Sequence, residues 1–336
     1  MDYEAFLKEW HNSSPTLLVH TSGSTGKPKP LLVEKRRMEA SARITCAFLG
    51  LKPGDRALLC LSLDYIAGKM MVVRALTCGL RLTIVPPTGL PQWEGAVDFA
   101  AMVPLQVWNL LHDTDGRRRL MQVRHLIIGG GPIDDALAAE LRTFPNAVWS
   151  TYGMTETLSH IALRRLSGPE ASDYYTPLEG VSVALTADGC LTIDAPHVCP
   201  HPLVTNDRAE LTHGQRFRIL GRKDNVIVSG GVKIQIEEVE RLLRPHIPEP
   251  FMITKRTDPK YGEIVVMLVQ TSTPSLLSPL SSLLSPHYND ICSRVLPKYW
   301  QPRLMIPVSQ LPLTPTGKPA RAEAIRIAET FQGEQV

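Results

Sequence analysis

Short apolar runs alternate with stretches of helical periodicity over the first two thirds of the chain. Helices are expected at 34–50, at 66–78 and from Asp134, as the N-cap, to Arg142. Strands are expected at TLLVH (16–20), RALLCLSL (56–63), LRLTIV (80–85), AVDFAAM (96–102), VRHLIIGG (123–130) and AVWSTYG (147–153). Alternation of this kind indicates a layered α/β domain with a largely parallel sheet.

After Tyr152 the pattern changes. VSVALTADGCLTID (181–194) alternates between apolar and polar residues around the Asp-Gly pair at 188–189, which predicts a hairpin. Further small β segments follow, and the charged GRKDN (221–225) then separates two folding patterns, so we expect the domain boundary there.

The last third of the chain predicts a smaller α+β domain. Its pattern favours a helix at 236–244 and strands at 251–255 and 264–270. The segment 271–286 is rich in Ser, Leu and Pro, and we expect a loop with a poor helix in it.

Length and charge narrow the function classes. A chain of 336 residues usually folds into two or more domains. The net charge of +3 is nearly balanced and the longest basic block is 117–119, which argues against nucleic acid as a partner. The most apolar zone, 57–80, is interrupted by Asp64, Lys69 and Arg74, so no membrane span is expected.

The cysteines and the start of the chain bear on its location. The six cysteines show neither a CxxC pair nor His/Cys ligand spacing, and we expect free thiols in a reducing compartment. The start, MDYEAFLKEW, has no basic or apolar region of a signal peptide. The expected location is therefore the cytoplasm.

The stretch HTSGSTGKPKP (20–30) lies between two apolar runs. Glycines let backbone N–H groups approach an anion, and hydroxyls and lysines add donors and charge, so the stretch could hold phosphate. It is not a Walker A loop, because only two residues separate Gly23 from Gly26 where that motif has four. Taken alone, the stretch could equally be a turn.

Five more motifs follow in order: GGGPID (129–134), STYGMTET (150–157), TND (205–207), GRKDNVIVSGG (221–231) and LPLTPTGKPAR (311–321). We expect TND to precede a β segment. The set resembles the adenylate-forming superfamily of acyl-CoA synthetases, luciferases and peptide-synthetase adenylation domains. The resemblance covers residues 16–325. It implies a large AMP-binding domain at 1–221, a hinge at 222–225 and a smaller, mobile domain at 226–336 that carries a catalytic lysine.

The resemblance also implies residue roles. For the β- and γ-phosphates of ATP it implies the loop residues Thr21, Ser22, Gly23, Ser24, Thr25, Gly26 and Lys29. For the rest of the site it implies Gly130, Gly131 and Pro132 beside the adenine and the acyl group, Tyr152 and Gly153 at the adenine, Thr155 at the α-phosphate, Glu156 on Mg²⁺, Asp207 on the ribose hydroxyls, Arg222 on ribose or phosphate, Asp224 as the hinge and Lys318 as the mobile catalytic lysine. Pro30 departs from the family's usual Gly and stiffens the loop exit.

The implied reaction has two halves. A carboxylate attacks the α-phosphorus of ATP and pyrophosphate leaves, while Lys318 and Mg²⁺ stabilise the developing charge. The small domain then turns about Asp224, and the thiol of coenzyme A attacks the acyl-adenylate.

The segment 58–85 resembles the o-succinylbenzoate–CoA ligase branch of the family, which belongs to menaquinone biosynthesis. Arg74 falls on that branch's arginine, and Tyr65 stands at an aromatic position of its pattern. The resemblance of residues 157–165 to that branch implies that Ser159 and His160 lie near the acyl group. The second carboxylate of o-succinylbenzoate needs a cation if it is buried, and Arg74, with Lys69 as a further candidate, could supply one.

Alternatives stay open at this point. Arg74 could be a cation on a helix surface, and His160 could be a packed wall residue. The acid could be another aryl or short acyl acid, the acceptor could be a carrier protein, or the chain could be a nucleotide-binding module without catalysis. Only nineteen residues precede His20, where the family usually has a further subdomain. We therefore expect a shortened version, in which another subunit or a rearranged edge covers that side; a homodimer is the expected form.

Overall fold

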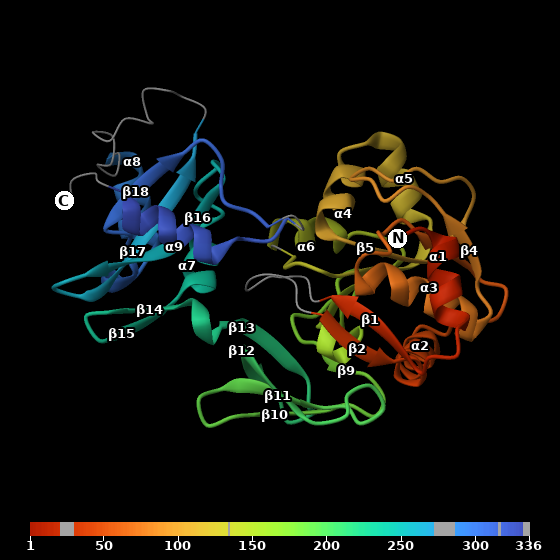
Figure 1. The fold of residues 1–336 in the computed structure, drawn as a ribbon. Coiled ribbons are helices and arrows are strands. Elements are labelled where there is room, and N and C mark those ends of the chain that lie inside the picture. Colours follow the sequence, from red (N-terminus) through yellow and green to blue (C-terminus); the bar gives the residue numbers. More distant parts are fainter. Residues whose placement is uncertain (21–29, 134, 272–285, 315–316, 332–336) are drawn as a thin grey trace. The chain divides into compact units, whose positions relative to one another are not determined.

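The computed structural model describes residues 1–20, 30–133, 135–271, 286–314 and 317–331 of the chain (Figure 1). These residues form two compact units. The first comprises 1–20, 30–205 and 210–218, and the second comprises 206–209 and the described residues from 219 onward. The hinge expected at 222–225 stays a prediction.

A seven-stranded sheet forms the centre of the first unit, with the strand order β4-β3-β5-β6-β7-β8-β9. Its strands are β3 (Arg56–Leu59), β4 (Arg81–Ile84), β5 (Val97–Met102), β6 (Val123–Ile128), β7 (Ala147–Gly153), β8 (His160–Arg165) and β9 (Thr176–Pro177). The pairs from β4 to β7 are parallel, whereas β8 and β9 join in antiparallel fashion. The prediction of a largely parallel sheet is confirmed.

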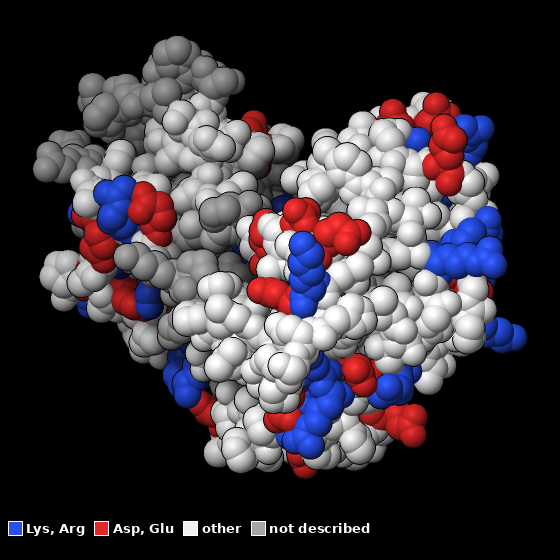
Figure 2. All heavy atoms as spheres, turned by 45° about the vertical axis from the view of Figure 1, so that its right-hand side comes forward, with Lys and Arg blue, Asp and Glu red and all other residues white. Residues whose placement is uncertain are grey.

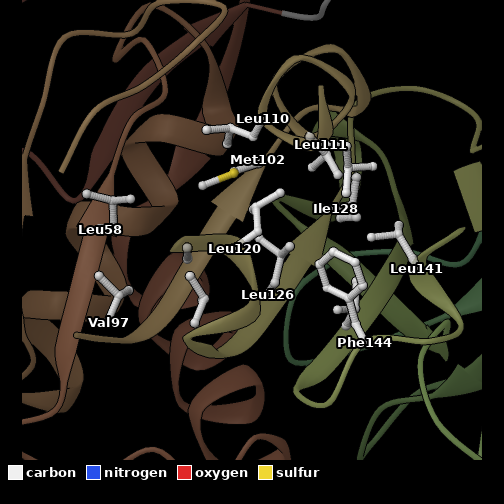
Figure 3. Close-up of a cluster of buried hydrophobic side chains, with 14 of the residues drawn as sticks. Leu58, Val97, Met102, Leu110, Leu111, Leu120, Leu126, Ile128, Leu141 and Phe144 are labelled. Atoms are coloured by element: carbon white, nitrogen blue, oxygen red, sulfur yellow. The ribbon is translucent and has the colours of Figure 1, made fainter. Parts of the chain in front are cut away.

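Helices cover both faces of this sheet. The helices of the unit are α1 (Tyr3–His11), α2 (Lys35–Phe48), α3 (Ile66–Cys78), α4 (Pro104–Leu111), α5 (Thr114–Met121) and α6 (Asp135–Leu141). Leu58, Met102 and Ile128 pack against Leu110 and Leu141 from α4 and α6 (Figure 3). Alternate strand residues point to opposite faces, so Phe99 of β5 faces the other side, where α3 packs on β3 and β4.

Two smaller sheets contain the other strands that begin in the first unit. An antiparallel ribbon pairs β1 (Thr16–His20) with β2 (Pro30–Glu34). A four-stranded sheet has the order β10-β11-β12-β13, with β10 (Ser182–Leu185), β11 (Cys190–Asp194), β12 (Leu203–Leu211) and β13 (Phe217–Arg222). The hairpin expected around residues 188–189 joins β10 to β11, and Gly189 adopts a φ of +79° at its turn.

The second unit packs helices on both faces of a five-stranded sheet. Its strands β14 (Val226–Ser229), β15 (Val232–Gln235), β16 (Phe251–Asp258) and β17 (Gly262–Gln270) have the order β15-β14-β17-β16, and β18 (Leu304–Val308) pairs with β17 in parallel. Its helices are α7 (Ile236–Leu243), α8 (Pro286–Val295) and α9 (Arg321–Thr330). Residues from α7 and α8 form one apolar cluster with the sheet, and residues from α9 form another.

Two of the expected elements need correction. The strand expected at 56–63 ends at Leu59, and the residues after it pack closely against α3, where a Cβ on Gly68 would lie 2.2 Å from the Ser62 carbonyl oxygen. Residues 205–207 lie inside β12, not before a strand. The segment 271–286, expected as a loop with a poor helix, lies mostly outside the described residues. Asp134, the expected N-cap of α6, also lies outside them.

The charged side chains and the cysteines agree with what the sequence predicts. On the face shown in Figure 2, acidic and basic side chains lie in small mixed groups. All six cysteines are free of disulfides. In the part of the chain that the structure describes, no helix is long and apolar enough to cross a membrane.

Candidate active site

Two loops that carry expected site residues leave the same edge of the large sheet. β6 ends at Ile128 and leads into Gly130, Gly131 and Pro132, and the neighbouring parallel strand β7 ends at Gly153. The carboxyl ends of parallel strands meet at one edge, which is the usual place for ligands in such sheets. Gly130 has a φ of +82°, a backbone conformation that favours glycine.

Gly153 holds the next segment close to β7. A Cβ at this position would lie 2.2 Å from the carbonyl oxygen of Ser159, so only glycine lets the two backbones approach this closely. Tyr152 packs against Phe217 and Tyr175, with ring centroids 5.1 Å and 5.8 Å away. The end of β7 therefore offers an aromatic wall beside the edge of the sheet.

Thr155 and Glu156 begin a short 3-10 turn, Thr155–Thr157, immediately after β7. Thr155 is buried, whereas Glu156 is exposed and its carboxylate makes no ion pair with any described residue. Among the described residues there is also no group of three or more His, Cys, Asp or Glu side chains that could hold a metal. A single free carboxylate fits Mg²⁺, which is commonly held by one or two carboxylates together with substrate phosphates.

The expected phosphate loop lies outside the described residues. This applies to Thr21, Ser22, Gly23, Ser24, Thr25, Gly26 and Lys29. Their roles stay predictions.

Asp207, Arg222 and Asp224 lie together in the second unit. Arg222 donates two hydrogen bonds to the Asp224 carboxylate at 2.9 and 2.8 Å, and its Nη1 lies 3.3 Å from Oδ1 of Asp207. Burial acts to raise the pKa of Asp224, but the hydrogen bond and charge of Arg222 outweigh it and the pKa is lowered. Asp224, which is expected at the hinge, is thus hydrogen-bonded to Arg222, and Arg222 also contacts Asp207. Both Arg222 and Asp207 are expected at the nucleotide.

Lys318 closes a tight turn of the second unit. Thr314 donates its backbone N–H to the Lys318 carbonyl at 2.7 Å, and the backbone N–H of Lys318 donates to Oγ1 of Thr314 at 3.1 Å. Gly317 has a φ of +76° in this turn. Burial lowers the pKa of the Lys318 amine.

Arg74 is buried, so the alternative of a cation on a helix surface is wrong. Its side chain lies on α3 with a relative exposure of 2%. Nη2 donates to Oγ of Ser159 at 2.5 Å, and the guanidinium carbon lies 6.0 Å from the centre of the Phe99 ring. Burial lowers the pKa of Arg74 to about 10, and the nearby thiols of Cys46 and Cys78 act against that shift.

The guanidinium of Arg74 has unused donors. Its Nε is buried without a hydrogen-bond partner, and no carboxylate of the described residues lies within ion-pair distance of it. A buried cation normally has a partner, because desolvation of an unpaired charge is costly. The unused donors of Arg74 could therefore pair with an anion.

His160 is buried at the start of β8 and contacts residues from two other segments. Its Nε2 lies 3.1 Å from Oγ1 of Thr45 on α2, and its Nδ1 lies 3.3 Å from Oγ of Ser159. Burial, followed by the charge of Arg74, holds the pKa of His160 well below the ordinary value of 6.5. His160 is thus a packed residue that also contacts the residue bound to Arg74.

Two other candidates lie elsewhere. Nζ of Lys69 is buried 5.7 Å from the centre of the Phe6 ring and 3.6 Å from the sulfur of Met1, which places it against α1. Tyr65 lies just before α3 and is 42% exposed. Its substrate role stays a prediction.

Sequence reasoning missed Thr45. A signal was present, because Ser41 and Thr45 both fall on the apolar face of the expected helix at 34–50, and both are buried. Hydroxyls on a buried face need hydrogen-bond partners, which points to polar groups packed against that helix.

The low pKa of His160 gives a prediction for stability. The unfolded chain takes up a proton near pH 6.5 and the folded chain does not, so this contribution to stability is complete above pH 6.5 and is lost as the pH falls. We expect the free energy of unfolding to drop by about 1.4 kcal/mol per pH unit from this one group. Denaturant unfolding of the protein and of His160→Gln from pH 7 downward measures it. His201→Gln, at an exposed position, should keep the wild-type slope, and an unchanged slope in His160→Gln would contradict the assignment.

Comparisons with known proteins give the family. The model of the family described as "AMP-binding enzyme" matches residues 4–190. A curated relative, 2-succinylbenzoate–CoA ligase of Salmonella typhimurium, is 30% identical over 79% of this chain and 60% of its own length. The protein of the same name from Bacillus cereus strain Q1 is 24% identical over 97% of this chain and 73% of its own length.

Solved structures show the same fold. An acyl-CoA synthetase (AMP-forming)/AMP-acid ligase II-like protein from Dyadobacter fermentans is 34% identical, with a TM-score of 0.63, over 95% of this chain and 92% of its own. The o-succinylbenzoate coenzyme A synthetase of Bacillus subtilis, solved with ATP and magnesium, is 22% identical with a TM-score of 0.72, over 91% and 69%. The chain spans about three fifths of the length of the Salmonella relative.

Proposed function

The chain belongs to the AMP-binding enzyme family, and from that membership we propose that it is an AMP-forming acid–CoA ligase. The proposed reaction joins a carboxylic acid to AMP, with release of pyrophosphate from ATP, and then passes the acyl group to coenzyme A. The acid we propose is o-succinylbenzoate (2-succinylbenzoate), after which the similar ligases from Salmonella typhimurium and Bacillus cereus are named.

One observation carries the choice of acid. Arg74 is a buried cation with unused donors and no carboxylate partner among the described residues. o-Succinylbenzoate brings a second carboxylate that takes no part in the reaction and stays charged. A pairing of this ring carboxylate with Arg74 would offset the desolvation of both groups. Benzoate and fatty acids lack that second charge.

The remaining roles are those that the family resemblance implies, and the chemistry of each side chain is consistent with them. Thr155 would bind the α-phosphate, and Asp207 would accept hydrogen bonds from the ribose hydroxyls. Mg²⁺, held by Glu156 and the phosphates, would neutralise phosphate charge. Lys318 would stabilise the charge that develops as the acid attacks the α-phosphorus. Coenzyme A would enter for the second half-reaction after the second unit has moved about Asp224.

Two further points belong to the proposal. A cytoplasmic location is consistent with six cysteines that form no disulfide. A homodimer also stays part of the proposal.

The deciding experiment measures pyrophosphate release with ATP and Mg²⁺, with and without coenzyme A, for o-succinylbenzoate, benzoate and a fatty acid. We expect turnover with o-succinylbenzoate and a kcat/KM about 10²-fold lower with benzoate, which lacks the second carboxylate. Formation of the CoA thioester separates the ligase from a domain that loads a carrier protein. Turnover only with other acids would show that the substrate is wrong. ATP binding without pyrophosphate release from any acid would show a nucleotide-binding module.

A further inference from the structure

Four side chains from three segments form one hydrogen-bonded chain in the first unit. Its links are Arg74 Nη2 to Ser159 Oγ at 2.5 Å, Ser159 Oγ to His160 Nδ1 at 3.3 Å, His160 Nε2 to Thr45 Oγ1 at 3.1 Å, and Thr45 Oγ1 to the Ser41 carbonyl oxygen at 3.0 Å. Arg74, His160, Thr45 and Ser41 are all buried. The chain therefore begins at the unused cation and ends inside α2.

The Ser41 end of the chain and the neutral state of His160 fix the direction of the hydrogen bonds. The Ser41 carbonyl can only accept, so Thr45 gives it its one hydroxyl proton and must accept from the Nε2–H of His160. Burial lowers the pKa of His160, so the ring is neutral, its one proton lies on Nε2, and Nδ1 accepts from the Ser159 hydroxyl. The guanidinium can only donate, so Ser159 accepts from Arg74 at the same time.

We propose that His160 and Thr45 are positioning residues, which set the direction of the Arg74 guanidinium toward a substrate carboxylate by way of Ser159. The inference rests on the proposed function, since it presumes an anionic group on the acid. Nδ1 of His160 accepts a hydrogen bond from Ser159, so a lone pair of Ser159 stays directed at Nη2 of Arg74. This holds one corner of the planar guanidinium and leaves its other N–H groups, including the unpartnered Nε, for the carboxylate.

A consequence separates this arrangement from direct contact. The proton of Ser159 is committed to His160, so Ser159 does not donate to the substrate but acts through Arg74. A change at Thr45, three links away from the guanidinium, should then weaken acid binding without touching the substrate. A purely structural role for Thr45 would instead alter the folded fraction and leave the KM values of the folded enzyme unchanged.

Kinetics of Thr45→Val and Thr45→Ser test the proposal. Valine keeps the shape and removes the acceptor, and we expect KM for o-succinylbenzoate to rise by up to about tenfold, the effect of losing one hydrogen bond, while KM for ATP stays constant. Thr45→Ser restores the acceptor and should rescue the KM. Thr254→Val is the matched control, because Thr254 is a buried threonine of the second unit whose hydroxyl has no partner among the described residues. An unchanged KM in Thr45→Val would overturn the proposal.

The tautomer of His160 gives a second test, which needs no substrate. In the ¹⁵N-histidine-labelled wild-type protein, the resonances of His160, assigned as those missing in His160→Gln, should show a protonated Nε2 and an unprotonated Nδ1. A proton on Nδ1, or an imidazolium, would overturn the proposal even if the enzyme is active. Absence of pyrophosphate release from o-succinylbenzoate in the wild type would overturn the proposed function instead, whatever the tautomer.

Discussion

Lys318→Ala should lower the rate of acyl-adenylate formation by about 10²–10³, the usual cost of removing one preorganised donor from a developing negative charge. Lys318 is held in a tight turn by the reciprocal hydrogen bonds between its backbone and Thr314. The effect is expected in kcat for pyrophosphate release, because the amine would act on the transition state. Calorimetric titration should show that ATP still binds to the variant, since its proposed contacts lie on other residues.

Two comparisons make that result specific. Lys298→Ala removes an exposed lysine from the same unit and should leave the rate unchanged. Supplying the acyl-adenylate and coenzyme A directly should bypass the need for Lys318, because the proposed motion has removed the lysine by that stage. Equal rates of pyrophosphate release in Lys318→Ala and the wild type would show that another group stabilises the charge.

Local sequence patterns predict a helix or strand well where a residue at its end marks the boundary. The helix expected at 66–78 matches α3, since Gly79 takes a left-handed conformation with a φ of +65° that ends it. The expected strand at 56–63 extends beyond the observed end at Leu59, because Cys60 and Leu63 are buried although they lie outside the sheet. Burial gives the same apolar pattern to a strand and to a packed turn, so periodicity alone cannot locate that end.

The site was predictable where backbone chemistry determines it and ambiguous where packing does. The glycines after β6 and at the end of β7 indicate close approach of the chain, and both loops lie at one sheet edge. The environment of Arg74 depends on α2 packing against α3 and on the loop that brings Ser159 to it, contacts between segments up to 85 residues apart. No local pattern contains them. For Thr45 the pattern of the helix indicates burial alone, because its partner His160 lies 115 residues away in the sequence.

The burial of Arg74 has a cost for the empty protein. An unpaired guanidinium inside the first unit loses its hydration and donates one hydrogen bond to Ser159 in return. Replacing a buried charge by an apolar side chain of similar volume is often neutral or stabilising. If Arg74 serves to bind an anion, stability and substrate binding should therefore respond to its removal in opposite directions.

Arg74→Met should raise the free energy of unfolding by about 1–4 kcal/mol, since the buried charge is removed and its volume is largely kept. The same change should raise KM for o-succinylbenzoate about 10²-fold or more, because the ring carboxylate would be buried without a partner. Denaturant unfolding and pyrophosphate release measure the two effects on one preparation. Arg326→Met, which removes an exposed arginine paired with Glu323 on α9, should change neither by much. A variant that is less stable and keeps its KM would mean that Arg74 supports the fold and that the acid is bound elsewhere.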